Sequence, residues 1–347
     1  MTRERGPGMT DKTTSAMEQK VRNLHEKNVV IDALGGYGFP YVDILNAGIN
    51  ALNVTLNMYA SEGLDHVFAQ IKRYYGLIET DPARLLLVEK INDIPKAKQD
   101  GKLGLIFGMQ NGGPLGQDVT LLSILYKLGV RIIQLTYNEA NALGCGCLES
   151  HDTGLTSFGV QAVQAMNRLG VLIDLSHTGY QTSREAIEAS DYPVAFTHAN
   201  PSALKNVPRN RPDELIRLLA DKGGFIGVSP YAAFCKSKPG GRPTLADFLD
   251  QVDYVVQLVG GDHVGIGTDK FEGKTKEEYL LEVQSRYSKL IDVPFEHRHV
   301  EGFSHIGHFP RITEGLLSRG YSDEECAGIL GGNFFSLLKK VWRNPVF

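Results

Sequence analysis

Short runs of apolar and β-branched residues recur along the chain, and they alternate with longer segments whose apolar positions repeat at helical spacing. This alternation is typical of a parallel sheet with crossover helices. Eight such runs are present, with no break in composition between them, so the pattern predicts a closed (β/α)8 (TIM) barrel rather than an open sheet. The eight predicted strands are 28–34, 49–57, 103–110, 130–138, 169–177, 193–199, 223–230 and 263–269.

The segments between the strands carry helix start and stop signals. Thr156 or Ser157 is expected to cap a helix over 157–170, and Gly170 is expected to end it. No GxGxxG or GxxxxGK[ST] motif follows the first strand, which argues against a nucleotide-binding sheet. Two further helices are predicted over 183–190 and 212–224.

Some segments exceed a bare barrel. Residues 271–309 follow the eighth strand and are polar and rich in histidine, which predicts a long insertion on the active-site face. Residues 310–345 predict two closing helices, with Ser322 capping the second. Residues 1–20 are polar and are expected to form a flexible extension, so the single barrel domain is predicted over 21–347.

Composition narrows the classes of partner. The formal net charge is −4 and no long basic run occurs, so neither nucleic acid nor an anionic membrane is expected as a partner. Four cysteines do not form a disulfide framework in a chain of 347 residues, which fits a reducing compartment. The polar first residues show no apolar signal region, and we expect a cytoplasmic protein that acts on a small molecule.

Candidate chemistry lies at the carboxyl ends of the predicted strands, where barrel proteins carry their sites. His177 and His198 end the fifth and sixth strands, and Asp269 ends the eighth. Two imidazoles and a carboxylate suit either a divalent metal or acid–base chemistry. Asp32, at the end of the first strand, is read as a turn cap rather than a site residue.

Several long stretches resemble one known family. Over about residues 22–345 the chain is similar to the membrane (renal) dipeptidase family of zinc metallopeptidases. The resemblance implies a barrel hydrolase with two zinc ions that cleaves dipeptides through a metal-bridging hydroxide. It is carried by GLTSFGVQAVQAMNRLGVLIDLSHTG (154–179), PVAFTHANPSAL (193–204), PRNRPDELIRLLADKGGFIGV (208–228), HVGIGTD (263–269) and the tail GYSDEECAGILGGNFFSLLKKVW.

The resemblance also implies roles for individual residues. His177 and His198 match the two histidines on the family's second zinc, and Asp269 matches an aspartate that handles protons near the metals. Arg209, followed by Asn210, matches a contact to the substrate carboxylate, a task that suits a guanidinium because it binds carboxylates bidentately.

Three departures from the family pattern concern the metals and the substrate. Leu34 and Gly36 stand where the family has a His-x-Asp pair for the first zinc, and neither residue can ligate a cation. Gln110 stands at the bridging glutamate, and Tyr137 at a substrate-binding histidine. A two-zinc centre is therefore not expected.

The remaining ligands leave one zinc ion or none. A single ion on His177 and His198 would be completed by Asp269, Gln110 or water. Without metal, the two histidines would act as acid–base groups tuned by Asp269. A less favoured interpretation is that histidines of the insertion after the eighth strand replace the missing ligands of the first zinc. The histidines concerned are His297, His299, His305 and His308.

The favoured function is hydrolysis of a C–N bond in a small amino-acid derivative, with Tyr137, Gln110, Arg209 and Asn210 binding substrate. The alternatives are a metal-free enzyme acting on a small carboxylate and a non-catalytic pseudoenzyme. A homodimer is left open, because the apolar tail FFSLLKKVW packs equally well on the barrel or on a second copy.

Overall fold

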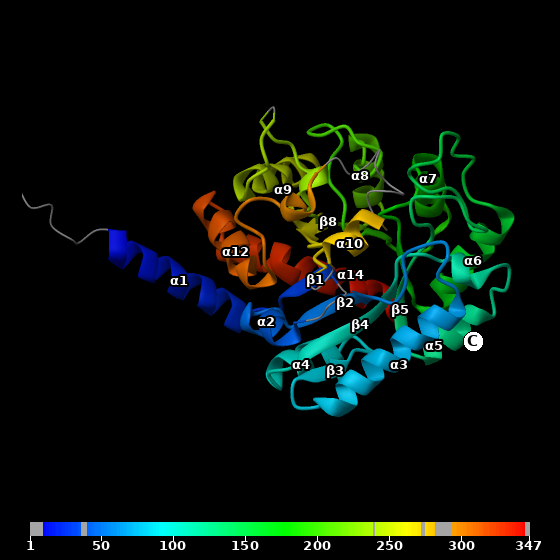
Figure 1. The fold of residues 1–347 in the computed structure, drawn as a ribbon, viewed down its shortest axis with the longest axis horizontal. Coiled ribbons are helices and arrows are strands. Elements are labelled where there is room, and N and C mark those ends of the chain that lie inside the picture. The colour runs from blue at the N-terminus through cyan, green and yellow to red at the C-terminus, as the bar shows by residue number, and fades with distance from the viewer. Residues whose placement is uncertain (1–9, 36–39, 239, 272–274, 282–292, 344–347) are drawn as a thin grey trace, which may run out of the picture.

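The computed structural model describes residues 10–35, 40–238, 240–271, 275–281 and 293–343. Figure 1 shows parallel strands at the centre with helices around them. The eight predicted strands are all present, and they pair in the order expected for a barrel. They are β1 (Ile31–Gly35), β2 (Ala51–Thr55), β4 (Leu103–Met109), β5 (Val130–Gln134), β6 (Leu172–Asp174), β7 (Ala195–Phe196), β8 (Phe225–Val228) and β9 (Val264–Ile266).

The ring of strands is closed where the first strand meets the last. The backbone N–H of Asp269 donates to the carbonyl of Leu34 at 2.9 Å, and Gly35 forms a parallel bridge with Lys270. These contacts lie just beyond the end of β9, so the barrel closes at its carboxyl-terminal mouth. The (β/α)8 prediction is confirmed.

One strand was not predicted. β3 (Leu85–Leu87) pairs with the first half of β4, along the edge whose second half pairs with β5. Three consecutive leucines carry no alternation of apolar and polar positions, so the sequence pattern did not separate this strand from the preceding helix.

Helices between the strands largely follow the predicted signals. The side chain of Thr156 caps α6 (Ser157–Leu169) by accepting from Gly159 N, and Gly170 ends it with a φ of +73°. The other predicted helices are α7 (Tyr180–Ala189) and α8 (Asp213–Asp221). The remaining helices are α2 (Tyr41–Asn46), α3 (Leu64–Thr80), α4 (Asp93–Gln99), α5 (Leu121–Lys127), α9 (Leu245–Val259) and α10 (Lys276–Tyr279).

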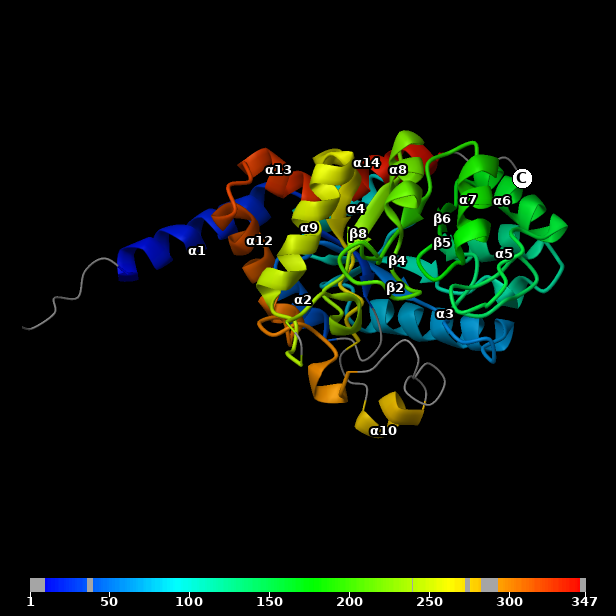
Figure 2. The same cartoon turned by 90° about the horizontal axis from the view of Figure 1, so that it is seen from above.

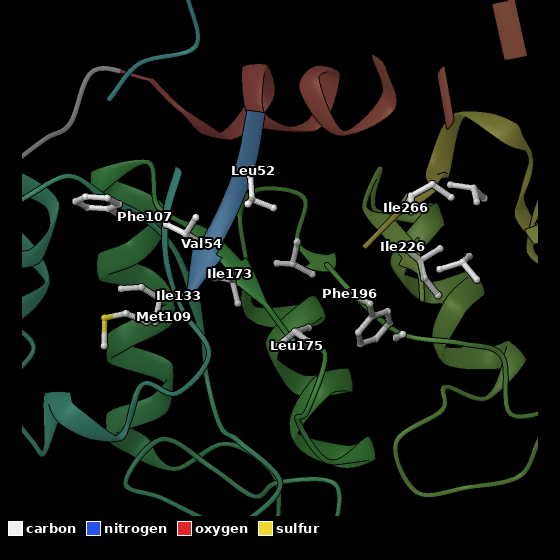
Figure 3. Packing of buried hydrophobic residues seen from close by; sticks show 14 of the residues in the cluster. Leu52, Val54, Phe107, Met109, Ile133, Ile173, Leu175, Phe196, Ile226 and Ile266 are labelled. Carbon is white, nitrogen blue, oxygen red and sulfur yellow. The ribbon is translucent and has the colours of Figure 1, made fainter. Parts of the chain in front are cut away.

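The two faces of each strand have different neighbours. Alternate apolar side chains pack outward against the helices and form the largest core cluster. The inward side chains near the strand starts are also apolar, whereas those near the strand ends are polar, which places buried polar groups at the mouth. Figure 3 labels members of the outer layer, among them Leu52 and Val54 on β2, Phe107 on β4, Ile133 on β5, Ile173 on β6, Phe196 on β7 and Ile226 on β8.

The last carboxyl-terminal helix closes the opposite end of the barrel. The predicted pair over 310–345 is three helices, α12 (Phe309–Ser318), α13 (Asp323–Ala327) and α14 (Asn333–Val341). Ser322 forms a capping box with Glu325, as predicted. The apolar face of α14 packs on the starts of the strands.

The amino-terminal segment is helical from Thr10. Helix α1 (Thr10–Lys27) begins within residues 1–20, which the sequence assigned to a flexible extension, and it projects from the body of the barrel (Figures 1 and 2). Among the described residues, no helix combines the length and apolar character that a membrane span requires.

Candidate active site

The site is built around two histidine side chains that face each other across neighbouring strand ends. His177 and His198 are buried, and their Nε2 atoms lie 3.0 Å apart. Burial lowers the pKa of both imidazoles well below the usual value, and the nearby Arg209 guanidinium lowers them further. Both rings are therefore neutral near pH 7, which is the form that ligates metal or accepts a proton.

His198 is held in place by Thr197, which is hydrogen-bonded to the carboxylate of Asp174. Thr197 Oγ1 lies 2.9 Å from His198 Nδ1 and donates to Asp174 Oδ2 at 2.6 Å. Asp174 Oδ1 also accepts from the backbone N–H and the hydroxyl of Ser176. Burial raises the pKa of Asp174, and the hydrogen bonds from Ser176 and Thr197 act in the opposite direction.

His177 is held by residues of the loop that follows β5. Its Nδ1 lies 2.7 Å from Asn138 Oδ1, which also accepts from the thiol of Cys147. Tyr137 stacks on the imidazole with ring centroids 4.0 Å apart. Asn138 has a φ of +61°, and it shares positive φ with Asp269 alone among the described non-glycine residues. Backbone strain of this kind gathers at functional sites, and here both residues lie at the barrel mouth.

Two buried arginine side chains, Arg209 and Arg211, lie near the histidines and differ in their hydrogen-bond partners. Arg211 donates to the carbonyls of Thr178, Ser176 and Arg209, so its donors are used within the fold. Arg209 donates from Nη2 to the carbonyl of His198 at 2.6 Å. Within the described residues its Nε and Nη1 atoms are buried without a hydrogen-bond partner, an arrangement that suits an incoming anion.

Asp269 lies at the barrel mouth, just after β9, and its carboxylate acts electrostatically on Arg209. Its charge raises the pKa of Arg209 against the lowering effect of burial, which is the larger. Behind it, the buried His299 places its Nε2 atom 3.4 Å from the Asp269 carbonyl. The Lys270 ammonium lies 3.5 Å from His299 Nδ1 and donates to the carbonyl of Ser304.

The other predicted substrate residues are partly engaged in the fold. Gln110 is buried and donates to Thr55 Oγ1 at 2.7 Å. Asn210 donates to the carbonyls of Lys205 and Phe234, while its buried Oδ1 has no partner among the described atoms. Asn210 thus ties the Arg209 loop to the loop after β8.

Asp32 faces the helix layer instead of the mouth. Its carboxylate accepts from the backbone N–H and the hydroxyl of Thr268, and it lines a small cavity with Ile44 and Leu52. Burial raises the pKa of Asp32 to about 7, against hydrogen bonds from Thr268 and Leu34. Its role is to hold the strand end that carries Asp269, in keeping with the predicted turn role.

The side chains present do not fit a two-zinc centre. Leu34 is buried but has no donor atom, Gln110 is an uncharged amide, and Gly36 lies outside the described residues. No group of three or more His, Cys, Asp or Glu side chains in the described parts of the chain could hold a metal ion. The histidine pair supplies two nitrogen donors, and zinc–imidazole bonds of about 2.0–2.1 Å would let both Nε2 atoms, 3.0 Å apart, reach one ion whose other ligands come from elsewhere.

Most of the histidine-rich insertion lies away from this pair. His297 and His305 are exposed, and His305 faces Asp43 at 3.5 Å. Of the four, His299 contacts Asp269 and Lys270 at the mouth. The sequence interpretation missed Asp174 and Thr197; the local signal was a threonine directly before His198 and another before Asp269.

Gly267, directly after β9, packs so closely against Thr197 and His198 that a larger side chain would displace them. A Cβ added to Gly267 would lie 2.0 Å from the Thr197 carbonyl and 3.1 Å from His198 Cβ. We expect Gly267→Ala to lower the free energy of unfolding by about 1–3 kcal/mol and to weaken zinc binding, measured by urea denaturation and calorimetric titration. Gly76→Ala is the control, because open space surrounds that position on α3 and alanine there stabilises by about 0.5–1 kcal/mol. A Gly267→Ala protein with parental stability and zinc affinity would contradict this reading of the packing.

A closed parallel barrel with histidines from adjacent strand ends at its mouth defines the chain as a barrel of the metallo-dependent hydrolase type. Residues 43–293 match the family model described as membrane dipeptidase (peptidase family M19). The chain belongs to this family.

Known proteins share the fold over most of the chain. It is 35% identical to a solved amidohydrolase from Pseudomonas aeruginosa, with a TM-score of 0.86 over 93% of this chain and 99% of that one. A metallo peptidase from Rhodobacter sphaeroides, solved with a phosphinate mimic of the dipeptide L-Ala-D-Ala, is 17% identical with a TM-score of 0.76, over 91% of this chain and 100% of that one. Dipeptidase aclJ of Aspergillus oryzae is 29% identical over 278 residues, or 79% of this chain, and the match spans 60% of the length of that relative.

Proposed function

We propose that this protein hydrolyses the C–N bond of a small amino-acid derivative that carries a free carboxylate. The observation that carries the proposal is Arg209, a fully buried guanidinium with Nε and Nη1 unpartnered among the described residues, anchored directly behind His198. Leaving such donors unpaired costs about 1–3 kcal/mol or more, so a substrate carboxylate that pairs with them is strongly favoured.

In the proposed chemistry some residues bind the substrate and others take part in the reaction. Arg209 binds the carboxylate, and Tyr137, stacked on His177, forms the wall against which the substrate lies. Asp269 would accept a proton from the attacking water; its place at the end of β9 and its electrostatic effect on the pKa of Arg209 support this role. At most one metal ion would be held by His177 and His198, and it would polarise the scissile carbonyl.

Metal content distinguishes this proposal from its alternative. Elemental analysis of purified, active protein is expected to give one zinc per chain at most. Full activity in protein stripped of metal would favour the metal-free enzyme, in which the neutral imidazoles alone move protons.

Arg209→Lys tests the carboxylate contact. A lysine keeps the charge but loses the bidentate fork, so kcat/KM for a dipeptide such as L-Ala-D-Ala is expected to fall about 10- to 150-fold. The parent is expected to prefer this dipeptide strongly over its carboxamide, and the variant is expected to lose that preference. The measurement is the ratio of kcat/KM for the two substrates.

Arg211→Lys is the matched control. Arg211 is equally buried, but its donors go to backbone carbonyls, so the change is expected to reduce stability while the preference for a free carboxylate persists. A parent enzyme that cleaves acid and amide equally, or a control that loses the preference as Arg209→Lys does, would overturn the assignment.

A further inference from the structure

A continuous chain of polar contacts runs through the two histidines. From one end, Asp174 Oδ2 accepts from Thr197 Oγ1 at 2.6 Å, and Thr197 Oγ1 lies 2.9 Å from His198 Nδ1. At the other end, His177 Nδ1 lies 2.7 Å from Asn138 Oδ1. The imidazoles meet in the middle, with Nε2 atoms 3.0 Å apart. Each contact has a direction, because every atom in the chain either donates or accepts.

The direction at His198 follows from the carboxylate. A carboxylate only accepts, so the single hydroxyl hydrogen of Thr197 points to Asp174. The Thr197 oxygen then has lone pairs to offer His198 Nδ1, which must carry the hydrogen. Burial raises the pKa of Asp174, and four hydrogen bonds that converge on it from Ser176 and Thr197 oppose this effect and favour the carboxylate.

The direction at His177 follows from the amide. Asn138 Oδ1 can only accept, so His177 Nδ1 must also carry its hydrogen. The thiol of Cys147 donates to the same oxygen, which is consistent with an oxygen at that position. With both hydrogens on Nδ1, the two neutral rings present bare Nε2 lone pairs to each other at 3.0 Å.

Two facing lone pairs repel unless a positive charge lies between them. We propose that Asp174, acting through Thr197, and Asn138 are positioning residues that lock both imidazoles in the Nδ1–H form, so that the pair binds one cation. Metal-ligating histidines usually donate their other ring nitrogen in this way, and loss of such a partner typically lowers metal affinity about 10- to 100-fold. The inference rests on the proposed single-ion site and not on any particular substrate.

The substitution Asp174→Asn is expected to reverse the direction of the hydrogen bonds that run through the histidine pair, while the side chain keeps nearly the same shape. The new amide NH₂ donates to Thr197 Oγ1, whose hydrogen then points to His198 Nδ1 and moves the ring hydrogen to Nε2. His198 Nε2–H now donates to His177, and the cation site closes. We expect ¹⁵N NMR of histidine-labelled apoprotein to show Nδ1–H for His198 in the parent and Nε2–H in the variant. Zinc affinity, measured by calorimetric titration, is expected to fall about 10- to 100-fold.

Threonine variants separate this effect from a general loss of packing. Thr197→Val removes the relay hydroxyl and is expected to lower zinc affinity like Asp174→Asn, whereas Thr197→Ser keeps the hydroxyl and the parental affinity. Thr268→Val is the matched control. Thr268 is equally buried, precedes Asp269 at the next-but-one strand end, and donates to Asp32 instead of serving an imidazole. The Thr268→Val variant is expected to lose about as much stability as Thr197→Val and to keep the parental zinc affinity.

The threonine comparison decides the question even if Asp174→Asn does not fold. The proposal is overturned if parental His198 carries its hydrogen on Nε2, if Asp174→Asn binds zinc as the parent does, or if Thr268→Val and Thr197→Val lose affinity equally. Because these readouts are taken on apoprotein with zinc alone, a parent that binds zinc but cleaves no dipeptide refutes the proposed function and leaves this inference standing.

Discussion

Replacing His198 by alanine is expected to lower kcat/KM by about 10²- to 10⁴-fold and to abolish stoichiometric zinc binding. The reason is geometric, since His198 supplies one of the two Nε2 atoms that face each other at 3.0 Å and holds Arg209 through its carbonyl. The carbonyl survives the substitution, so substrate binding through Arg209 persists and the loss falls mainly on kcat. Steady-state kinetics and zinc titration measure the two effects.

His263→Ala is the matched control for this prediction. His263 also lies beside β9, but at its amino-terminal start, where its Nδ1 contacts the carbonyl of Gly224 at 2.8 Å. Its removal is expected to leave kcat/KM and zinc binding at parental values. Parental activity in His198→Ala would show that hydrolysis takes place elsewhere than at the barrel mouth.

Phe334→Ala is expected to cause the largest loss of stability, about 3–5 kcal/mol. Phe334 is buried on α14 and packs against Phe225 of β8 with ring centroids 4.8 Å apart, closing the end of the barrel opposite the site. Removing the ring leaves a cavity beneath the inward apolar side chains of the strands. Urea denaturation measures the loss, and kcat/KM at low temperature is expected to stay near the parental value because the site lies at the other end.

Phe335→Ala separates the effect of burial from the effect of residue type. Phe335 is the next residue of the same helix but is only partly buried, so its loss is expected to cost clearly less. Equal losses of stability from both substitutions would contradict the assignment of Phe334 to the buried face of α14 that closes the end of the barrel.

Much of the fold was predictable because barrel strands are short apolar runs at regular intervals. β7 is only two residues long, yet the run around Ala195 and Phe196 was recognised because it lies between two amphipathic helices. β3 was missed because Leu85–Leu87 shows no periodicity and its pairing depends on β4, which it joins only in part. Thr156 and Ser322 were recognised as caps because capping uses residues within one turn.

The candidate site was predictable only in part. His177, His198 and Asp269 could be placed at the mouth because parallel strand ends meet at one edge. The roles of Asp174 and Thr197 were not visible, since their hydrogen bond joins residues 23 positions apart on different strands. The different roles of Arg209 and Arg211, two residues apart, were also not visible, since Arg211 donates to backbone carbonyls that only the fold brings close to it.

The sequence by itself determined the barrel and the strand ends that carry His177, His198 and Asp269, and it supports the prediction that Leu34, Gly36 and Gln110 stand at positions where the family holds its first metal. These follow from local periodicity and from which atoms a side chain contains. Only the tertiary structure decided which buried donors remain unpaired, as at Arg209, and in which direction the hydrogen bonds through the histidine pair run. Those properties depend on donors and acceptors that barrel closure brings together, so no single stretch of the chain records them.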